Sequence, residues 1–363
     1  MTTDERFMLR AMELAQLGIG MVSPNPRVGC VIVTDGRIIG EGWHQKYGEA
    51  HAEVNAVRSV ADHSLLKDST VYVNLEPCSH FGKTPPCADL LIQHQVKKVV
   101  ISNLDVNPLV AGKGIEKLRT AGIEVLTGIL ERQGEELNQR FFTFIKKQRP
   151  YIILKWAQTA DGFIARSNFD SKWISNQYSR QLVHKWRSEE DAVLVGTSTA
   201  AHDNPYLTVR DWSGRNPKRI AIDRFLRLPE TLHLFDESVD TICYNLVREQ
   251  EKNRLVYTKL NENDFIKALV NDLFVRKIQS VIVEGGAQTL QLFLDGGWWD
   301  EARVVISRQT FTTGVKAPMM KAKTVKKELI FGDELFFYKP ISVILRQSIF
   351  CVCKGLSFFS CCS

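Results

Sequence analysis

Three residues of the types that bind zinc, with a carboxylate beside them, occur early in the chain. His51 is followed by Glu53, and Pro77 precedes Cys78, with Cys87 nine positions further on. A catalytic zinc ion takes three protein ligands from histidine, cysteine or carboxylate and leaves its fourth position for water. His51, Cys78 and Cys87 supply that number. We therefore predict that they bind one Zn²⁺ per chain.

The carboxylate of Glu53 is the predicted catalytic group. Glu53 lies two positions after His51, so on an ideal helix the two side chains diverge by about 200°. We expect it to carry protons and not to be a fourth ligand. Zinc lowers the pKa of bound water toward about 7, which makes hydroxide available at neutral pH. A hydroxide beside a proton-carrying carboxylate fits hydrolytic deamination, in which an amidine-like carbon is attacked and ammonia leaves.

A second set of residues with binding chemistry lies later in the chain. The apolar segment 281–284 is followed by glycines at 285–286 and a predicted helix, so the backbone there can approach a phosphate. Alone this signal is weak, because strand–glycine–helix turns are common without a ligand. A turn at 196–199 offers hydroxyl groups. Arg187 and Arg210 are candidate forks for a phosphate, although either is equally a surface salt-bridge residue.

Strand and helix patterns alternate along the chain and restart after Pro150. Alternation on this scale is typical of three-layer α/β domains. Before Pro150 we predict strands at 28–33, 37–42, 70–75 and 96–101, and helices at 4–18, 51–61, 88–94, 114–120 and 131–147. After it we predict strands at 151–156, 192–195, 219–222, 241–244, 280–284 and 301–307, and helices at 179–189, 263–277 and 288–294. Two of the helices begin at zinc ligands, where the helix dipole favours thiolates.

Length and composition limit the classes of protein to consider. A chain of 363 residues predicts two domains, and 44% hydrophobic with 24% charged residues is close to the globular average. The net charge of +6 is spread thinly, so we expect no nucleic-acid partner. No apolar run approaches the roughly 20 residues that span a bilayer, so we expect no membrane association. The polar start at 1–6 lacks a secretory signal and predicts a cytoplasmic protein.

Eight cysteines do not make this a disulfide scaffold. Only Cys30, Cys78, Cys87 and Cys243 belong to the body of the chain, and such sparse cysteines are reduced thiols, metal ligands or core residues. The remaining four crowd the segment 341–363, which follows neither pattern of strands and helices and has no recognisable zinc spacing. We interpret it as an atypical tail without function.

The cysteine spacing points to one family of deaminases. The usual signature of zinc-dependent base deaminases is His-x-Glu with Pro-Cys-x-x-Cys, but here eight residues separate the cysteines. The segment 77–87 resembles the deaminase half of the bifunctional riboflavin-biosynthesis deaminase/reductases. Segments 25–30, 48–51 and 105–108 are similar to the same family, which usually has proline where Val106 stands. Within the insertion, His80 and Lys83 are candidate contacts for a substrate phosphate, with a solvent-facing loop as the equal alternative.

Later segments resemble the reductase half of the same family, which is similar in fold to dihydrofolate reductase and uses NADPH. The matching segments are 155–162, 171–175, 196–210 and 284–287, and the similarity is thin between 212 and 275. By position, the resemblance implies that NADPH is held by Gln158, Trp173, Thr199, Asp203, Gly286, Ala287, Gln288, Thr289, Leu290, Gln291 and Leu292. It implies that the ribose-phosphate substrate is held by Ser171, Arg187, Leu207, Arg210 and Glu284. Lys155 is a candidate acid for the reduction, with a buried ion-paired lysine as the equal alternative.

The resemblance implies a fold and a function for each half. We expect a cytidine-deaminase-like three-layer α/β/α domain at 1–147 and a dihydrofolate-reductase-like α/β domain at 148–340. The first would deaminate 2,5-diamino-6-(5-phosphoribosylamino)pyrimidin-4(3H)-one with zinc-bound hydroxide. The second would reduce the ribosyl side chain with NADPH to give 5-amino-6-(5-phosphoribitylamino)uracil. We also expect a homo-oligomer.

Two other functions stay open at this point. One is a nucleoside or tRNA deaminase whose second domain only binds substrate, which the long cysteine insertion and the thin positive charge disfavour. The other is a non-catalytic, zinc-stabilised regulator. Glu53 disfavours it, since a purely structural zinc site needs a fourth ligand and no acid.

Overall fold

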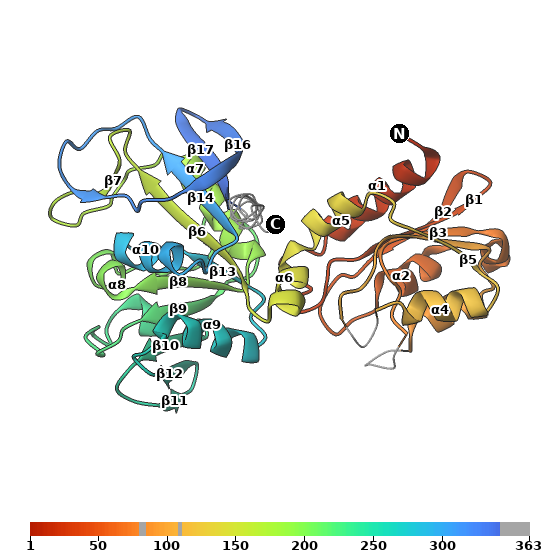
Figure 1. Cartoon of the computed structure of the whole chain (residues 1–363), viewed down its shortest axis with the longest axis horizontal. Coiled ribbons are helices and arrows are strands. Elements are labelled where there is room, and N and C mark those ends of the chain that lie inside the picture. The colour runs from red at the N-terminus through yellow and green to blue at the C-terminus, as the bar shows by residue number, and fades with distance from the viewer. Residues whose placement is uncertain (80–84, 108–110, 342–363) are drawn as a thin grey trace, which may run out of the picture. The chain divides into compact units, whose positions relative to one another are not determined.

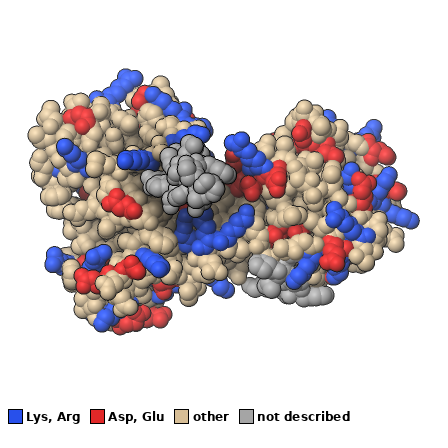
Figure 2. Space-filling model, viewed as in Figure 1, with Lys and Arg blue, Asp and Glu red and all other residues tan. Residues whose placement is uncertain are grey.

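The computed structural model describes residues 1–79, 85–107 and 111–341. The predictions for His80, Lys83 and all but the first residue of the tail lie outside the described residues. The chain forms two compact units: Met1–Tyr151 with Arg180–Ile282, and Ile152–Ser179 with the part that begins at Val283. Figure 1 labels the helices and strands along the chain. No helix in the described ranges has the length and apolar character needed to cross a membrane. On the face seen in Figure 2, basic and acidic side chains are intermixed.

The first 130 residues build a five-stranded sheet in the order β2-β1-β3-β4-β5. β1 is antiparallel to both neighbours, whereas β3, β4 and β5 are parallel to one another. A turn at Asp35-Gly36, a dipeptide typical of hairpins, joins β1 to β2, and both residues have positive φ (51° and 73°), as a tight hairpin requires. The strands are β1 (Gly29–Thr34), β2 (Arg37–Trp43), β3 (Thr70–Leu75), β4 (Lys98–Asn103) and β5 (Glu124–Thr127).

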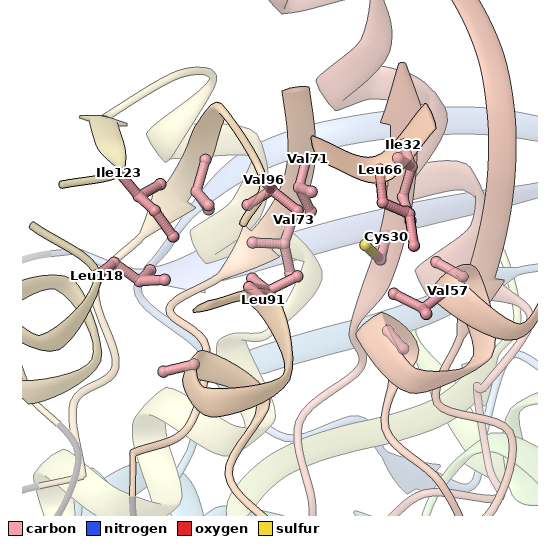
Figure 3. Close-up of a cluster of buried hydrophobic side chains, with 14 of the residues drawn as sticks. Cys30, Ile32, Val57, Leu66, Val71, Val73, Leu91, Val96, Leu118 and Ile123 are labelled. Atoms are coloured by element: carbon pink, nitrogen blue, oxygen red, sulfur yellow. The ribbon is translucent and has the colours of Figure 1, made fainter. Parts of the chain in front are cut away.

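Helices cover both faces of this sheet, because side chains alternate between the faces along each strand. Val71 and Val73 of β3 face a core that includes Leu91 and Leu118 (Figure 3), whereas Tyr72 belongs to the opposite core. The first core is covered by α2 (Ala52–Ser59), α3 (Cys87–Gln93) and α4 (Lys113–Thr120), and the second by α1 (Thr3–Gln16) and α5 (Glu131–Leu137). A short 3₁₀ helix, η1, spans His63–Asp68. The predicted three layers are confirmed.

One helix prediction is wrong. The single helix expected over 131–147 is two helices, α5 and α6 (Gln139–Lys147), that break at Asn138. The Asn138 side chain accepts a hydrogen bond from the backbone N–H of Arg27 (2.8 Å) and donates one to its carbonyl (2.9 Å). The helix break thus coincides with two hydrogen bonds from the Asn138 side chain to the backbone of Arg27, which is distant in sequence.

The strands after residue 150 fall into the two units. In the first unit neighbouring strands run β11-β12-β10-β9-β8-β13, with β8, β9, β10 and β12 parallel. Their bounds are β8 (Ala192–Gly196), β9 (Lys218–Ile222), β10 (Thr241–Asn245), β11 (Gln250–Lys252), β12 (Leu255–Lys259) and β13 (Ser280–Val283). The helices in this part are α7 (Gln177–Glu189), α8 (Thr197–Asp203), η2 (His233–Phe235) and α9 (Phe265–Val275).

In the second unit neighbouring strands run β6-β14-β17-β16, and only the β6–β14 pair is parallel. The bounds are β6 (Tyr151–Gln158), β7 (Phe163–Ala165), β14 (Glu301–Ile306), β15 (Val315–Lys316), β16 (Ala322–Ile330), β17 (Asp333–Pro340) and the helix α10 (Ala287–Asp295). Every predicted strand after Pro150 is present within about two residues. The long hairpin β16–β17 was not predicted, because β16 is mostly exposed and shows no alternation of apolar and polar residues.

Candidate metal centre and cofactor-binding segments

The three predicted zinc ligands come from three elements at one edge of the five-stranded sheet. His51 is the N-cap residue of α2, Cys87 is the first residue of α3, and Cys78 lies in the loop that follows β3. Ala52 and Ala88, which directly follow the two helical ligands, are both fully buried in the same core. Packing of the helices against the sheet therefore brings their N-termini to the carboxyl end of β3, and the expectation that ligands stand at helix starts is confirmed for His51 and Cys87.

The ligand atoms have the spacing of a tetrahedral zinc site. His51 Nδ1 lies 3.3 Å from Cys87 Sγ and 3.6 Å from Cys78 Sγ, and all three ligand atoms lie within 4.8 Å of one another. Zinc–sulfur and zinc–nitrogen bonds of about 2.3 and 2.0 Å at a tetrahedral angle separate S from N by roughly 3.5 Å. The residues therefore fit the ion, with Nδ1 as the donor atom of His51.

The two cysteines share a proton when no metal is bound. The hydrogen bond from the Cys87 thiol lowers the pKa of Cys78 to about 4, against the opposing effect of burial. The same hydrogen bond, together with burial, raises the pKa of Cys87 well above its usual range. The backbone N–H of Cys87 also donates to Cys78 Sγ at 3.3 Å. Cys78 is thus a thiolate at neutral pH, and metal binding would release the proton of Cys87.

Glu53 lies beside the ligands but outside the ligand cluster. It is in the first turn of α2, is only 3% exposed, and its side chain is hydrogen-bonded to Cys87. Burial raises the pKa of Glu53, because a buried carboxylate loses its hydration. A carboxyl group with a raised pKa takes up and releases its proton at a higher pH than a free carboxyl group does, which suits a proton carrier.

The ring of His44 contacts the ligand His51, and sequence analysis missed it. The two imidazole rings meet nearly edge-on, with centroids 5.5 Å apart. His44 Nδ1 lies 3.1 Å from the carbonyl oxygen of Ala50, and its Nε2 lies 3.1 Å from the side-chain amide nitrogen of Asn25. These partners assign the proton to Nδ1. Burial lowers the pKa of His44, against the opposing effect of the hydrogen bond to Ala50. No spacing signal marks His44, although Asn25 stands in a segment that resembles the family.

Predicted reductase residues of the first unit gather around the loop after α8. Arg187 of α7 donates to the carbonyl of Thr208 (3.2 Å), and the backbone N–H of Arg210 donates to His184 Nδ1 (3.2 Å). Leu207 between them is buried and has a positive φ of 54°. Thr199 and Asp203 lie on α8, so the turn expected at 196–199 is instead the start of a helix. His184, which holds this loop, was not predicted.

Other predicted residues belong to the second unit. Lys155 of β6 forms an ion pair with Glu284 (3.7 Å), and both side chains are mostly buried. Gly286 is the N-cap of α10, and Leu290 is 1% exposed, so its side chain belongs to the core and only its backbone could meet a ligand. Trp173, by contrast, is 64% exposed. The other predicted members of this unit are Gln158, Ser171, Ala287, Gln288, Thr289, Gln291 and Leu292.

Comparisons with known proteins match both halves. The cytidine and deoxycytidylate deaminase zinc-binding region matches residues 1–103, and the RibD C-terminal domain matches residues 150–314. The riboflavin biosynthesis protein RibD of Aquifex aeolicus is 41% identical over 332 residues, which cover 90% of this chain and 93% of that protein. RibD of Escherichia coli is 38% identical, covering 84% and 87%.

Solved structures agree with these relatives. A diaminohydroxyphosphoribosylaminopyrimidine deaminase/5-amino-6-(5-phosphoribosylamino)uracil reductase from Thermotoga maritima has a TM-score of 0.87 at 38% identity and covers 93% of this chain and 99% of its own. RibD of Acinetobacter baumannii has a TM-score of 0.86 at 35% identity, covering 94% and 99%.

Fold and site together define a zinc-dependent deaminase joined to a reductase in one polypeptide. The chain belongs to the RibD family of riboflavin biosynthesis proteins. It is a bifunctional enzyme of riboflavin biosynthesis that uses zinc for deamination and NADPH for reduction. The predicted fold class is confirmed, and the two alternatives, a base deaminase with a passive second domain and a non-catalytic regulator, are wrong.

Proposed function

We propose that the chain converts 2,5-diamino-6-(5-phosphoribosylamino)pyrimidin-4(3H)-one to its deaminated product and then reduces the ribosyl side chain to give 5-amino-6-(5-phosphoribitylamino)uracil. The observation that carries this proposal is the convergence of three ligand atoms within 4.8 Å, with buried Glu53 beside them. The substrate is that of the Thermotoga maritima relative, whose name states both activities. Phosphate on the substrate also suits the arginine pair of the reductase segments.

In the deamination, His51, Cys78 and Cys87 hold zinc, which when bound supplies an activated water at neutral pH. Glu53 would take one proton from the attacking water and deliver it to the ring nitrogen next to the attacked carbon. It would then take the proton of the newly added hydroxyl group and pass it to the departing amino group. A C–O bond forms, the C–N bond breaks, and ammonia leaves. Burial suits Glu53 for this work, because the raised pKa lets one carboxyl group serve as base and then as acid.

In the reduction, the residues of this chain orient NADPH over the opened sugar and exclude water, since hydride transfer depends on positioning. The N-terminus of α10 at Gly286 supports a phosphate of the cofactor through backbone N–H groups. Lys155, held by Glu284, donates the proton that accompanies the hydride. The proposed cofactor contacts are Gln158, Trp173, Thr199, Asp203 and Gly286–Leu292, and the proposed substrate contacts are Ser171, Arg187, Leu207, Arg210 and Glu284.

The same proposal covers domain limits, assembly and location. Residues 1–147 are the deaminase domain and 148–340 the reductase domain, which the two family matches support. The tail from residue 341 is dispensable. A chain that ends at residue 340 should therefore retain both activities. The proposal includes a homo-oligomer, and exposed Val325 and Leu329 on the sheet-edge strand β16 are candidate contact residues. A cytoplasmic location is supported by the free cysteines of the body.

The proposal is tested by following ammonia release and NADPH oxidation on the diaminopyrimidine phosphate. Wild-type enzyme should show both. Glu53→Ala should lose ammonia release by about 10²–10⁴-fold, the usual contribution of general acid–base catalysis. It should still oxidise NADPH when given pre-deaminated substrate. A Glu53→Ala variant that releases ammonia at the wild-type rate would contradict the assignment of Glu53.

A further inference from the structure

The side chain of Glu76 lies buried two residues before the zinc ligand Cys78 and accepts four hydrogen bonds from backbone N–H groups. It is 4% exposed. Its Oε2 accepts from the N–H groups of Asp105 (3.2 Å) and Gly112 (3.0 Å). Its Oε1 accepts from those of Gly114 (3.0 Å) and Ile115 (3.4 Å). One carboxylate therefore joins the segment after β4 to the first turn of α4.

The main chain at Glu76 is fixed on both sides. Glu76 directly follows β3, and its N–H donates to the carbonyl of Asn103 (3.0 Å), which extends the pairing of β3 with β4 by one residue. Two positions later stands the zinc ligand Cys78. Because the main chain of Glu76 is fixed, its side chain sets the position of the segment that begins at Asp105 relative to the loop that carries Cys78.

The start of α4 depends on Glu76 for its cap. The N-cap residue of α4 is Gly112, which has a φ of 79° and no side chain to accept from the first turn. Glu76 bonds the second and third N–H groups of the helix, the groups that an N-cap side chain normally satisfies. Its negative charge also suits the positive end of the helix dipole. A Cβ on Gly114 would lie 2.1 Å from the carbonyl oxygen of Pro77, so glycine permits this contact.

We propose that Glu76 is a positioning residue for substrate binding in the deaminase site. It holds the segment 105–107 and the start of α4 against the loop of Cys78. Because the carboxyl ends of neighbouring parallel strands form the ligand-binding edge of such a sheet, these segments form the wall of the site next to the metal. This role rests on the proposed zinc ligands and deaminase activity. Glu76 acts through the backbone groups that it holds and does not itself touch the reacting atoms.

The test compares Glu76→Gln with Glu124→Gln. The first variant keeps the side-chain shape but turns one acceptor oxygen into a donor that faces two N–H groups. The second is a matched control, because Glu124 pairs with Lys98 on the exposed surface of the same sheet. Three quantities are measured for each: kcat and KM for ammonia release, zinc per chain, and NADPH oxidation on pre-deaminated substrate.

We expect Glu76→Gln to lower kcat/KM for deamination by about 10- to 100-fold, mainly through KM, since small displacements of positioning groups have effects of this size. Zinc content and NADPH oxidation should match wild type, and Glu124→Gln should match it throughout. Unchanged deamination kinetics, loss of zinc, or a parallel fall of both activities would each overturn the proposal. A wild-type enzyme that releases no ammonia would instead refute the proposed function.

A conservative variant separates positioning from folding. Glu76→Asp keeps the charge but is shorter by one methylene group, so it cannot reach both pairs of N–H groups at once. If Glu76→Gln fails to fold, Glu76→Asp is measured instead. Its KM should be raised by up to about tenfold over wild type, and it should still bind zinc. A Glu76→Asp variant with wild-type KM and lowered thermal stability would assign Glu76 to stability alone and overturn the proposal.

Discussion

The metal centre and the reductase segments differ in how well the residue types predict the site. In the metal centre, three side chains from one sheet edge bring their ligand atoms within 4.8 Å of one another. The predicted reductase residues extend from Gln158 to Leu292 and are divided between the two compact units. Zinc ligands must be particular atoms at particular distances, whereas a dinucleotide is held largely by backbone and ordinary polar groups. The residue types and their order therefore predict the first site, whereas the second is predicted only through the resemblance.

The largest expected effect comes from removing zinc. Cys78→Ser, or treatment with a zinc chelator, should reduce ammonia release to background and leave NADPH oxidation on pre-deaminated substrate intact, because the ligands all belong to residues 51–87. Zinc per chain, measured by atomic absorption, should fall from one toward zero. Cys243→Ala is the matched control, since Cys243 is a buried free thiol outside the ligand cluster. If Cys78→Ser lost ammonia release and NADPH oxidation equally, the prediction that zinc serves only the deaminase site would be wrong.

The next effect belongs to the reductase. Lys155→Met should slow NADPH oxidation by about 10²–10⁴-fold if Lys155 supplies the proton, with ammonia release unchanged. Glu284→Gln should slow it too, because it removes the ion-pair partner at 3.7 Å. A double-mutant cycle on these two positions distinguishes the open alternatives. Coupling in kcat indicates a shared catalytic role, whereas coupling only in the free energy of unfolding indicates a structural ion pair.

A smaller effect is expected at His44. Its replacement by alanine removes the ring that meets His51 edge-on and leaves the carbonyl of Ala50 without this partner. Residues that orient metal ligands typically change metal affinity or activity by about 10- to 100-fold. We expect a loss of that size in ammonia release or zinc affinity, measured by competition with a chromogenic chelator. A His44→Ala variant with unchanged zinc affinity and kcat/KM would show that the edge contact has no role.

Sequence alone was sufficient for features that depend on residue type and periodicity. The ligand cluster and most core strands fall in this group, because ligand chemistry and burial restrict the residue types at these positions. The catalytic role of Glu53 stays a prediction. Features that depend on backbone partners were missed. Glu76 bonds four backbone N–H groups between residues 105 and 115, and neither their donors nor the approach of Gly114 to Pro77 is encoded in a spacing. Asn138 likewise breaks a helix through contacts with a loop more than 100 residues away.

The smallest of these effects concerns stability. Arg219 is fully buried and donates to Asp236 at 2.6 Å, and it also bonds the carbonyl groups of Tyr206 and His233. Burial opposes ionisation of Asp236, but hydrogen bonds from Arg219 and Ser238 outweigh it and lower the pKa of Asp236 to about 2. Asp236→Asn should lower the free energy of unfolding by about 1–3 kcal/mol at neutral pH, a moderate value because the carboxylate is about one-third exposed.

The stabilisation by Asp236 should depend on pH in a defined direction. A depressed carboxyl pKa stabilises the folded state fully above the unfolded pKa of about 4, and this contribution disappears as pH falls through about 2. The difference in unfolding free energy between wild type and Asp236→Asn, measured by urea denaturation, should therefore be constant from pH 7 to about 5 and shrink below 4. The deaminase should keep its kcat in the variant at neutral pH, since Asp236 lies outside residues 1–103, which match the deaminase zinc-binding region. A difference that grows on acidification would contradict the assignment of the stabilising charge to Asp236.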